Sequence, residues 1–428
     1  MRPILSRIIF ASAALLLPVI GVPAADFVTL HNFNFVDGDS PESPLIAFDN
    51  TLYGTAVGGG SAGNGTVFKV NTDGTGFATL YNFGNSDGFF PVAGLARNGD
   101  ALFGIAAGGG DPGSGTIYTI NIDGTGFTNI YDFSVVDNQG LNHDGANPDA
   151  SLVLAGDTLY GTTSEGGSAG TGTIFKINTD GSGFTSLYSF TAVDINRENN
   201  DGAFPTTRLV VSGRTLYGTA SQGGTGGSGT LFSINTDGTG FVTLHSFSAT
   251  ENNGFNRDGK NPDAPLALAG GTLYGTTFNG GSERSGTLFR IDIDGGDFTI
   301  LHAFSATDDH GFNNDGANPA GALVFSDDML YGTTVQGGKG GAGTIFAINA
   351  VSGRFVTVYS FGATRNGANA DGYSPFTGLV ASGDSLYGAA GGGGIFRGGT
   401  VFALRDVHSL FHRVRHSGHW KHDGFWEE

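Results

Sequence analysis

The chain of 428 residues contains no cysteine, two methionines, two tryptophans and few cations. Without cysteine there is no disulfide framework, thiolate metal site or thiol nucleophile. The chain has 20 Lys and Arg residues and 39 Asp and Glu residues, so its net charge is −19. Such a surface repels phosphate groups, which argues against a nucleic-acid partner and against an anionic membrane face.

Long apolar runs are also missing, except near the N-terminus. Residues 1–25 read MRPILSRIIFASAALLLPVIGVPAA, with two arginines, an apolar run over 8–22 and small residues at the end. This order is typical of a secretory signal peptide, and two prolines within a short run disfavour a membrane anchor. We therefore expect a secreted, extracellular or cell-surface protein, with the periplasm as an alternative, and no membrane span after cleavage.

Glycine and phenylalanine are abundant. The 76 glycines far exceed the usual share of about 7%, yet aromatic residues make up 11% of the chain, 35 of them phenylalanine. Glycine at turns with aromatic residues between them indicates an all-β protein with a real core.

One ten-residue phrase, such as TLYGTTSEGG at 158–167, occurs seven times. Its aromatic residue recurs at intervals of 50 to 57 residues, at Tyr53, Phe103, Tyr160, Tyr217, Tyr274, Tyr331 and Tyr387. Repeats of this length are typical of propeller blades rather than of solenoid coils.

Each repeat divides into four short runs of alternating hydrophobicity. In the third repeat they cover 151–156, 158–163, 172–177 and 184–190, and Asp180-Gly181 between the last two is a strong hairpin signal. Four antiparallel strands per repeat predict a propeller blade.

The strand count predicts how the ring closes. The first copy of the fourth run, Phe27–Phe33, precedes any first run, while the last third run, Gly399–Leu404, has no fourth run after it. Pairing these two segments removes two exposed edges. We therefore predict a seven-bladed β-propeller over 26–404, closed by the N-terminal strand. A β-solenoid is the alternative, but it explains only the glycines.

The connection between blades carries Asp-Gly-x-x-Pro in every copy. The copies begin at Asp37, Asp87, Asp144, Asp201, Asp258, Asp315 and Asp371. Asp and Gly are turn residues and Pro suits the first position of a strand, so we favour turn chemistry for this Asp. The oxygen-rich loop 306–316 suggests Ca²⁺ instead, with Asp308, Asp309 and Asp315 as candidate ligands.

Two features break the sevenfold pattern, and both are expected on the same face of the ring. The first two connections are short, and the next five are six or seven residues longer. Long insertions on one face of a repeat protein are common binding sites. Five residues after the aromatic residue of the phrase, four neighbouring blades carry polar side chains where the others have glycine. These candidate ligand-binding residues are Glu165, Gln222, Asn279 and Gln336. Surface variation in a loop explains them equally well.

Signals for catalysis are weak. The GxSxG, HExxH and GxxxxGK[ST] motifs are absent. Carboxylate pairs for glycoside hydrolysis are available among Glu165, Glu198, Glu251 and Glu283, but sequence cannot place two of them together. We predict no catalytic residue and no cofactor other than structural Ca²⁺.

The C-terminal segment 405–428 differs in composition and contains five histidines. His408, His412 and His416 would share one face of a helix, which suggests a transition-metal site. A flexible terminus is the commoner outcome.

The recurring pattern LYGTT-x-x-GG…GT-[IVL]-F-x-I-N-x-DG-x-G-F-x-x-L-[YH]-x-F resembles the GloVer-type tandem repeat of exported bacterial proteins. The resemblance covers about Phe27 to Leu404. It implies export and a variable C-terminal anchoring signal. The tail of this chain has no Pro-Glu-Pro, no LPxTG and no apolar helix followed by arginines, so no particular anchor is implied.

The sequence thus predicts a non-catalytic propeller, monomeric, that binds extracellular carbohydrate or protein. A carbohydrate-active lyase or hydrolase, or a structural component of an envelope or matrix, are the alternatives.

Overall fold

The computed structural model describes residues 26–111, 113–251, 255–326 and 329–407. The expected signal peptide and the histidines at 408, 412 and 416 lie outside the described residues. All 31 named elements are strands, and in the described part of the chain no helix is long and apolar enough to cross a membrane.

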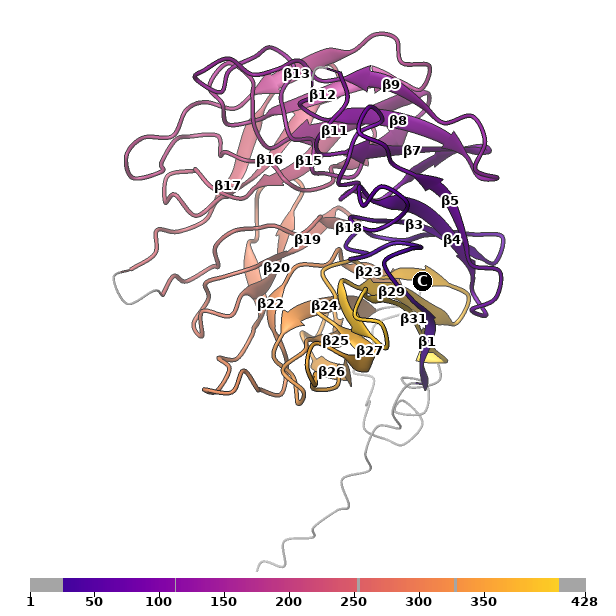
Figure 1. Ribbon diagram of the computed structural model, residues 1–428. Helices are drawn as coiled ribbons and strands as arrows, with labels where there is room; N and C mark the ends of the chain where they lie inside the picture. Colours follow the sequence, from indigo (N-terminus) through magenta and orange to yellow (C-terminus); the bar gives the residue numbers. More distant parts are fainter. Residues whose placement is uncertain (1–25, 112, 252–254, 327–328, 408–428) are drawn as a thin grey trace, which may run out of the picture.

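Seven four-stranded antiparallel blades form a ring, as Figure 1 shows. The innermost strands have three residues each: β2 (Ile46–Phe48), β6 (Ala96–Asn98), β10 (Val153–Ala155), β14 (Val210–Ser212), β18 (Ala267–Ala269), β23 (Val324–Ser326) and β28 (Val380–Ser382). The second strands contain the LYGT phrase: β3 (Thr51–Ala56), β7 (Ala101–Ala106), β11 (Thr158–Thr163), β15 (Thr215–Ala220), β19 (Thr272–Thr277), β24 (Met329–Gln336) and β29 (Ser385–Ala390).

The third strands are also largely buried: β4 (Thr66–Asn71), β8 (Thr116–Asn121), β12 (Thr173–Asn178), β16 (Thr230–Asn235), β20 (Thr287–Asp292), β25 (Thr344–Asn349) and β31 (Thr400–Arg405). The outer strands are β5 (Ala78–Asn82), β9 (Thr128–Asp132), β13 (Thr185–Ser189), β17 (Val242–Ser246), β21 (Thr299–Ala303), β26 (Phe355–Ser360) and β1 (Asp26–Asn32). Three short strands lie in connecting loops: β22 (Ala317–Pro319), β27 (Asn369–Tyr373) and β30 (Gly392–Gly394). This architecture confirms the predicted propeller and excludes the solenoid.

The predicted closure is confirmed. Strand β1 pairs antiparallel with β31, with Phe27 opposite Leu404 and Asn32 opposite Thr400. The last blade therefore has the order β1-β31-β29-β28, in which the first strand of the chain is the outermost. The two ends of the ring are held together by backbone hydrogen bonds, and neither β1 nor β31 is left without a partner at the closure.

The core lies between the blades rather than within them. Seven clusters of buried hydrophobic residues occur, and each joins two neighbouring blades. Between the third and fourth blades, for example, Tyr160 and Phe190 pack with Leu216 and Phe232. A single blade has no core of its own, so each depends on both neighbours.

The glycine of LYGT is required by this packing. A Cβ atom at Gly161 would lie 2.5 Å from Cζ of Phe175 and 2.9 Å from Cδ2 of Leu152. Leu152, directly before the first strand, and Phe175 of the third strand therefore fill the space above this glycine, and a larger residue would overpack it.

Aromatic stacking links neighbouring blades near the outer strands. A Tyr or His of one outer strand stacks on the Phe at the start of the next, with ring centroids 3.6–4.1 Å apart. The seven pairs are His31–Phe77, Tyr81–Phe127, Tyr131–Phe184, Tyr188–Phe241, His245–Phe298, His302–Phe355 and Tyr359–Phe27. The last pair shows that the N-terminal strand completes the ring in side-chain packing as well as in backbone pairing.

The closure predicts a stability change. Phe27→Ala removes the stack on Tyr359 and the packing against Phe402, and we expect a loss of about 2–3 kcal/mol in the free energy of unfolding. Removing all of β1 should cost more, because it also exposes the edge of β31. Chemical denaturation measures both. Val36→Ala, at a side chain that is 78% exposed just beyond β1, is the matched control. Equal stability of the Phe27 variant and the control would contradict the closure argument.

Candidate functional site

The connections between blades and the hairpins between second and third strands share one face of the ring, which we call the loop face. Backbone bridges join the two sets of loops at Ala146–Glu165, Ala203–Gln222 and Lys260–Asn279. In the sixth blade, Ala317 pairs with Gln336 in the same way. The expected grouping of long connections and polar positions on one face is therefore present.

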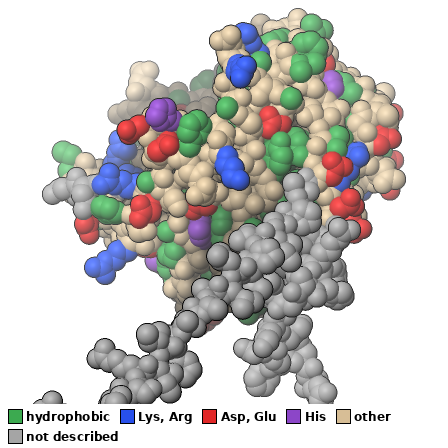
Figure 2. Space-filling view, turned by 90° about the horizontal axis from the view of Figure 1, so that it is seen from below, with side chains coloured by type: hydrophobic (Ala, Val, Ile, Leu, Met, Phe, Trp, Pro, Cys, Tyr) green, Lys and Arg blue, Asp and Glu red, His purple; other side chains and the backbone are tan. Residues whose placement is uncertain are grey.

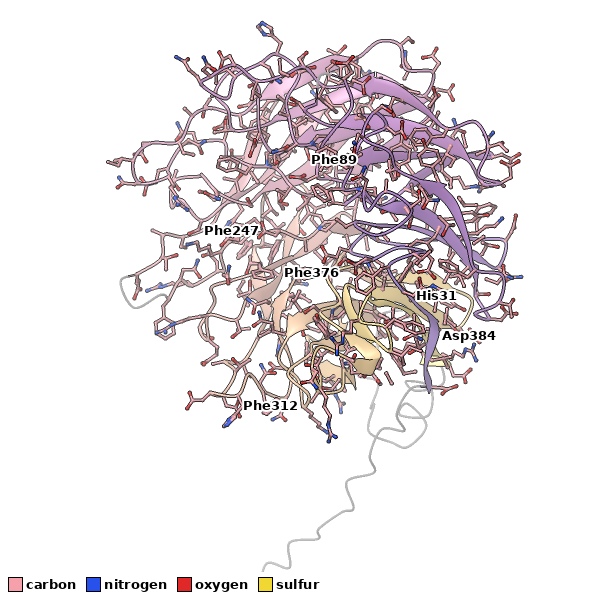
Figure 3. All side chains as sticks on the ribbon, viewed as in Figure 1. His31, Phe89, Phe247, Phe312, Phe376 and Asp384 are labelled. Atoms are coloured by element: carbon pink, nitrogen blue, oxygen red, sulfur yellow. The ribbon has the colours of Figure 1, made fainter. Side chains whose placement is uncertain are left out.

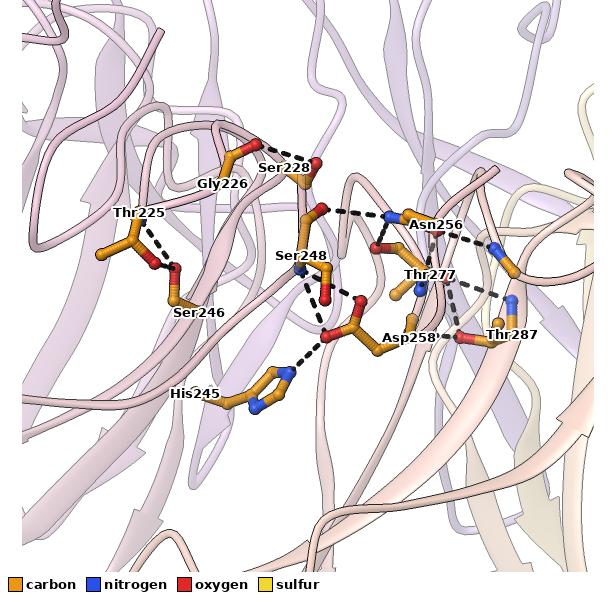
Figure 4. A network of polar contacts seen from close by, with 12 residues as sticks. Thr225, Gly226, Ser228, His245, Ser246, Ser248, Asn256, Asp258, Thr277 and Thr287 are labelled. Atoms are coloured by element: carbon orange, nitrogen blue, oxygen red, sulfur yellow. Dashed lines mark hydrogen bonds and ion pairs between the residues drawn. The ribbon is translucent and has the colours of Figure 1, made fainter. Parts of the chain in front are cut away.

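The Asp of each Asp-Gly-x-x-Pro repeat holds its connection to the preceding outer strand. Its carboxylate accepts a hydrogen bond from a Tyr hydroxyl or lies beside a His Nε2 of that strand, at 2.8–3.1 Å, in all seven blades. Figure 4 shows Asp258 between His245 Nε2 and the backbone N–H of Ser248. Burial raises the pKa of Asp258, but the hydrogen bonds from His245 and Ser248 outweigh it and leave the pKa below its usual value. This Asp has the turn-building role that the sequence favoured.

The three candidate calcium ligands are engaged separately. Asp315 bonds to His302 and Ser305. Asp308 accepts the backbone N–H groups of His310 and Phe312, which closes its own loop. Asp309 is exposed. Within the described ranges, no three His, Asp or Glu side chains are grouped to hold a metal ion.

The long connections are fixed to the ring by asparagine. Asn142 donates through Nδ2 to the carbonyl oxygens of Ser134 and Gly145, and its Oδ1 accepts the N–H of Gly167. Asn199, Asn256 and Asn313 make corresponding bonds in the next three connections. Each of these four loops is therefore tied to a glycine of the adjacent hairpin.

The four candidate ligand-binding residues occupy equivalent positions on neighbouring blades but are not equally free. Glu165 and Gln336 are exposed, and Gln222 is half-buried. The Asn279 side chain is taken up by hydrogen bonds with Asn261 and Asn318. The polar arc formed by these four residues therefore offers two exposed side chains.

A recess of about 380 Å³ opens among residues that the sequence interpretation did not select. Its lining consists of Glu42, Val92, Asp263, Phe278, Ala320 and Phe376. Five of these six directly follow the proline of the connection, each in a different blade. Because that proline leads into the innermost strand of each blade, the recess surrounds the ring axis at the loop face. We call it the axial pit.

The signal for the axial pit was present in the sequence. The residue after the repeat proline varies round the ring as Glu42, Val92, Asp149, Thr206, Asp263, Ala320 and Phe376. This position breaks the symmetry more strongly than the polar arc does, with three carboxylates and one exposed phenyl ring. The polar arc lies just outside the pit. In the fifth blade, Phe278 lines the pit, and the next residue, Asn279 of the polar arc, does not.

The carboxyl groups round the axis are poorly compensated. Protein atoms enclose Asp263 on most sides, although part of the side chain is accessible through the pit, and burial raises its pKa to about 6. Burial, together with the charge of Asp39, raises the pKa of Glu42. The carboxyl of Asp149 accepts a 2.6 Å hydrogen bond from Ser164, while burial and the charge of Glu165 raise its pKa.

Neither Asp263 nor Glu42 makes a side-chain hydrogen bond or ion pair with a described residue. The pit lining contains no Lys, Arg or His. On the side of the molecule seen from below, acidic, basic and apolar side chains are interspersed (Figure 2). The pit therefore combines negative charge with a mostly hydrocarbon lining.

A second recess, of about 320 Å³, lies further along the innermost strands. Its lining includes Arg208, Pro265 and Ala322. Each of these residues is two positions after a residue that follows a repeat proline (Thr206, Asp263 and Ala320), roughly 6–7 Å deeper at the usual rise of a strand. The Arg208 side chain is exposed and forms no ion pair with a described residue, and desolvation by the protein atoms around it lowers its pKa. Along the axis, negative charge at the mouth is thus followed by positive charge.

Comparisons with known proteins agree with the repeat architecture. A sequence model of the Gloeobacter/Verrucomicrobia repeat matches residues 21–199 and 141–313, which together span more than half of the chain. The chain belongs to this repeat family. Comparison with curated protein sequences gives no match.

Two solved structures show the same fold at 10% identity. An oligogalacturonate lyase in complex with manganese has a TM-score of 0.51, with 90% of this chain and 94% of that chain covered. The extracellular domain of a protein described as a one-component system from B. thetaiotaomicron has a TM-score of 0.52, with 90% and 40% covered. At this identity the likeness extends to the fold alone.

The raised pKa of Asp263 predicts a pH-dependent stability. The folded protein holds this proton more tightly than the unfolded chain, so the contribution of the carboxyl to stability is complete below about pH 4 and is lost as the pH rises through about 6. We expect Asp263→Asn to raise the free energy of unfolding by about 2–3 kcal/mol near pH 8 and to have little effect near pH 4.

Denaturant titrations at the two pH values test this expectation. Asp100→Asn, an equal charge change at an exposed hairpin residue without positive φ, is the control. A gain at pH 8 that is no larger than that of the control would show that the carboxyl is not destabilised by its surroundings.

Proposed function

We propose that this member of the Gloeobacter/Verrucomicrobia repeat family is an exported, non-catalytic binding module whose ligand, an extracellular carbohydrate or protein, docks on the loop face. Export is supported by the signal-like residues 1–25 and by the character of the repeat family. The ring supplies a rigid platform, and the loops supply specificity.

The axial pit is the observation that carries this proposal. A recess with unpaired carboxylates costs stability, and such conflicts concentrate at sites with a function. The exposed Glu165 and Gln336 of the polar arc and the long connections lie on the same face, where they would extend the contact beyond the pit. The connections are held by asparagine, so little ordering would accompany binding.

A carbohydrate-active enzyme is the second candidate. The specific observation in its favour is the Asp263 carboxyl, whose pKa of about 6 suits a general acid near neutral pH. Its partner would be Glu42, which lines the same pit. Because the two solved structures resemble the chain in fold alone, they favour neither candidate.

A glycan array, a screen for polysaccharide depolymerisation and capture of surface proteins separate these functions. We expect the wild-type chain to bind without turnover, and Asp263→Asn or Glu165→Ala to weaken binding by about tenfold or more. Asp100→Asn serves as the control. The assays are run with and without Ca²⁺ because the calcium prediction for Asp308, Asp309 and Asp315 is still open.

Turnover that disappears in Asp263→Asn would replace the binding proposal with the enzyme. Absence of both binding and turnover would favour a structural role in an envelope or matrix.

A further inference from the structure

The axial pit has the composition of a site for a cation on a hydrocarbon stem. Four of its six lining residues, Val92, Phe278, Ala320 and Phe376, have purely hydrocarbon side chains, and the other two carry carboxylates. The lining side chains include no amide or hydroxyl, so a sugar ring would find side-chain partners for its hydroxyl groups there only in the two carboxylates.

The Asp263 carboxylate is the more enclosed of the two unpaired carboxylates of the pit. It is largely enclosed, it accepts no hydrogen bond from a described residue, and its side chain borders the open volume. An enclosed carboxylate is stable only when it is paired, so the surroundings favour a positively charged ligand group. At about pH 8 the carboxyl is ionised.

Two phenyl rings reinforce this preference. Phe376 is 40% exposed and lies near the middle of the ring in Figure 3, whereas Phe312 of a long connection lies at its edge. Phe278 reaches the same pit from the end of β19. A ring face attracts an ammonium group and also packs against methylene groups.

The recess below the pit limits how deep a cation can go. Arg208 lines that second recess and forms no ion pair with a described residue. Its positive charge opposes the entry of a ligand cation beyond the level of Asp263. The cation is therefore held at the mouth, close to the loop face.

On these grounds we infer that the axial pit binds a primary alkylammonium group, such as a lysine side chain of a protein partner or a free aliphatic diamine presents. The ammonium lies against the carboxylate of Asp263, and Glu42 adds negative charge from the opposite side of the lining. The methylene stem packs on Phe376, Phe278 and Val92. This inference rests on the proposed binding role of the loop face and identifies the chemistry that its centre recognises.

Isothermal titration calorimetry at about pH 8 and low salt, with the whole chain, tests the inference with three probes. The probes are a blocked pentapeptide with one central lysine, the same peptide with that lysine acetylated, and 1,5-diaminopentane. We expect the lysine peptide to bind and the acetylated peptide to lose about 10- to 100-fold in affinity. A diamine that binds as tightly as the peptide would identify a free amine as the source, and a weaker diamine would identify a protein lysine.

Variants locate the site. Asp263→Asn should weaken the lysine peptide by about 10- to 100-fold, and Phe376→Ala by about two- to fivefold. Asp100→Asn on the opposite face carries the same charge change and should bind like the wild type. Because Asp263→Asn is expected to stabilise the fold at this pH, its loss of binding cannot be attributed to unfolding.

Equal binding of the acetylated peptide, unchanged affinity in Asp263→Asn, or no binding of any probe would overturn the inference. These failures are distinct from failure of the proposed function. A glycan or protein that binds the wild type and Asp263→Asn equally, while the amine probes fail, removes only the ammonium site. Binding of the lysine peptide with a blank glycan array removes the carbohydrate ligand and leaves the ammonium site in place.

Discussion

Packing between blades is the interaction on which this fold depends. Each blade buries its apolar faces only against its two neighbours, so a ring opened between the last and first blades would expose a complete set of core residues such as Phe33 and Phe68. The folded ring is therefore stable only when it is closed. The pairing of β1 with β31 meets it with backbone hydrogen bonds, and the stack of Phe27 on Tyr359 extends the aromatic contacts across the seam.

Closure also decides what meets at the axis. The Asp-Gly-x-x-Pro connection enters every innermost strand in the same way, with the residue before proline at positive φ in all seven copies, from Ser40 to Ser374. That conformation is costly for residues other than glycine, and asparagine, which tolerates it best, occupies three of the copies. Because the backbone conformation is the same in every copy, the residue after the proline lies near the ring axis in each of the seven blades. Variation at that one position is enough to build a pit.

The pit differs from the rest of the loop face in that its carboxylates lack hydrogen-bond partners among the described residues. The carboxylates of the repeated Asp residues are each bonded to the preceding outer strand, to a Tyr hydroxyl in four blades and to a His Nε2 in three. Asp263 and Glu42 have no such partners, and burial raises the pKa of both. The repeated Asp residues occur in every blade and hold the connections in place. Asp263 and Glu42 form no contact of that kind. This contrast is the physical basis for placing function at the axis.

The sequence by itself determined the blades, their number and the closing strand, because hydrophobic alternation, Asp-Gly turns and the repeat interval are local signals that sevenfold repetition reinforces. It also indicated the turn role of residues such as Asp144, and it selected the correct face. It did not single out Asp263, Glu42 or Phe376, since these residues are more than 100 positions apart and look like ordinary loop variation when the chain is read in order. Only the closed ring brings them round one axis, where enclosure by protein changes the pKa of the carboxyls and leaves them without partners.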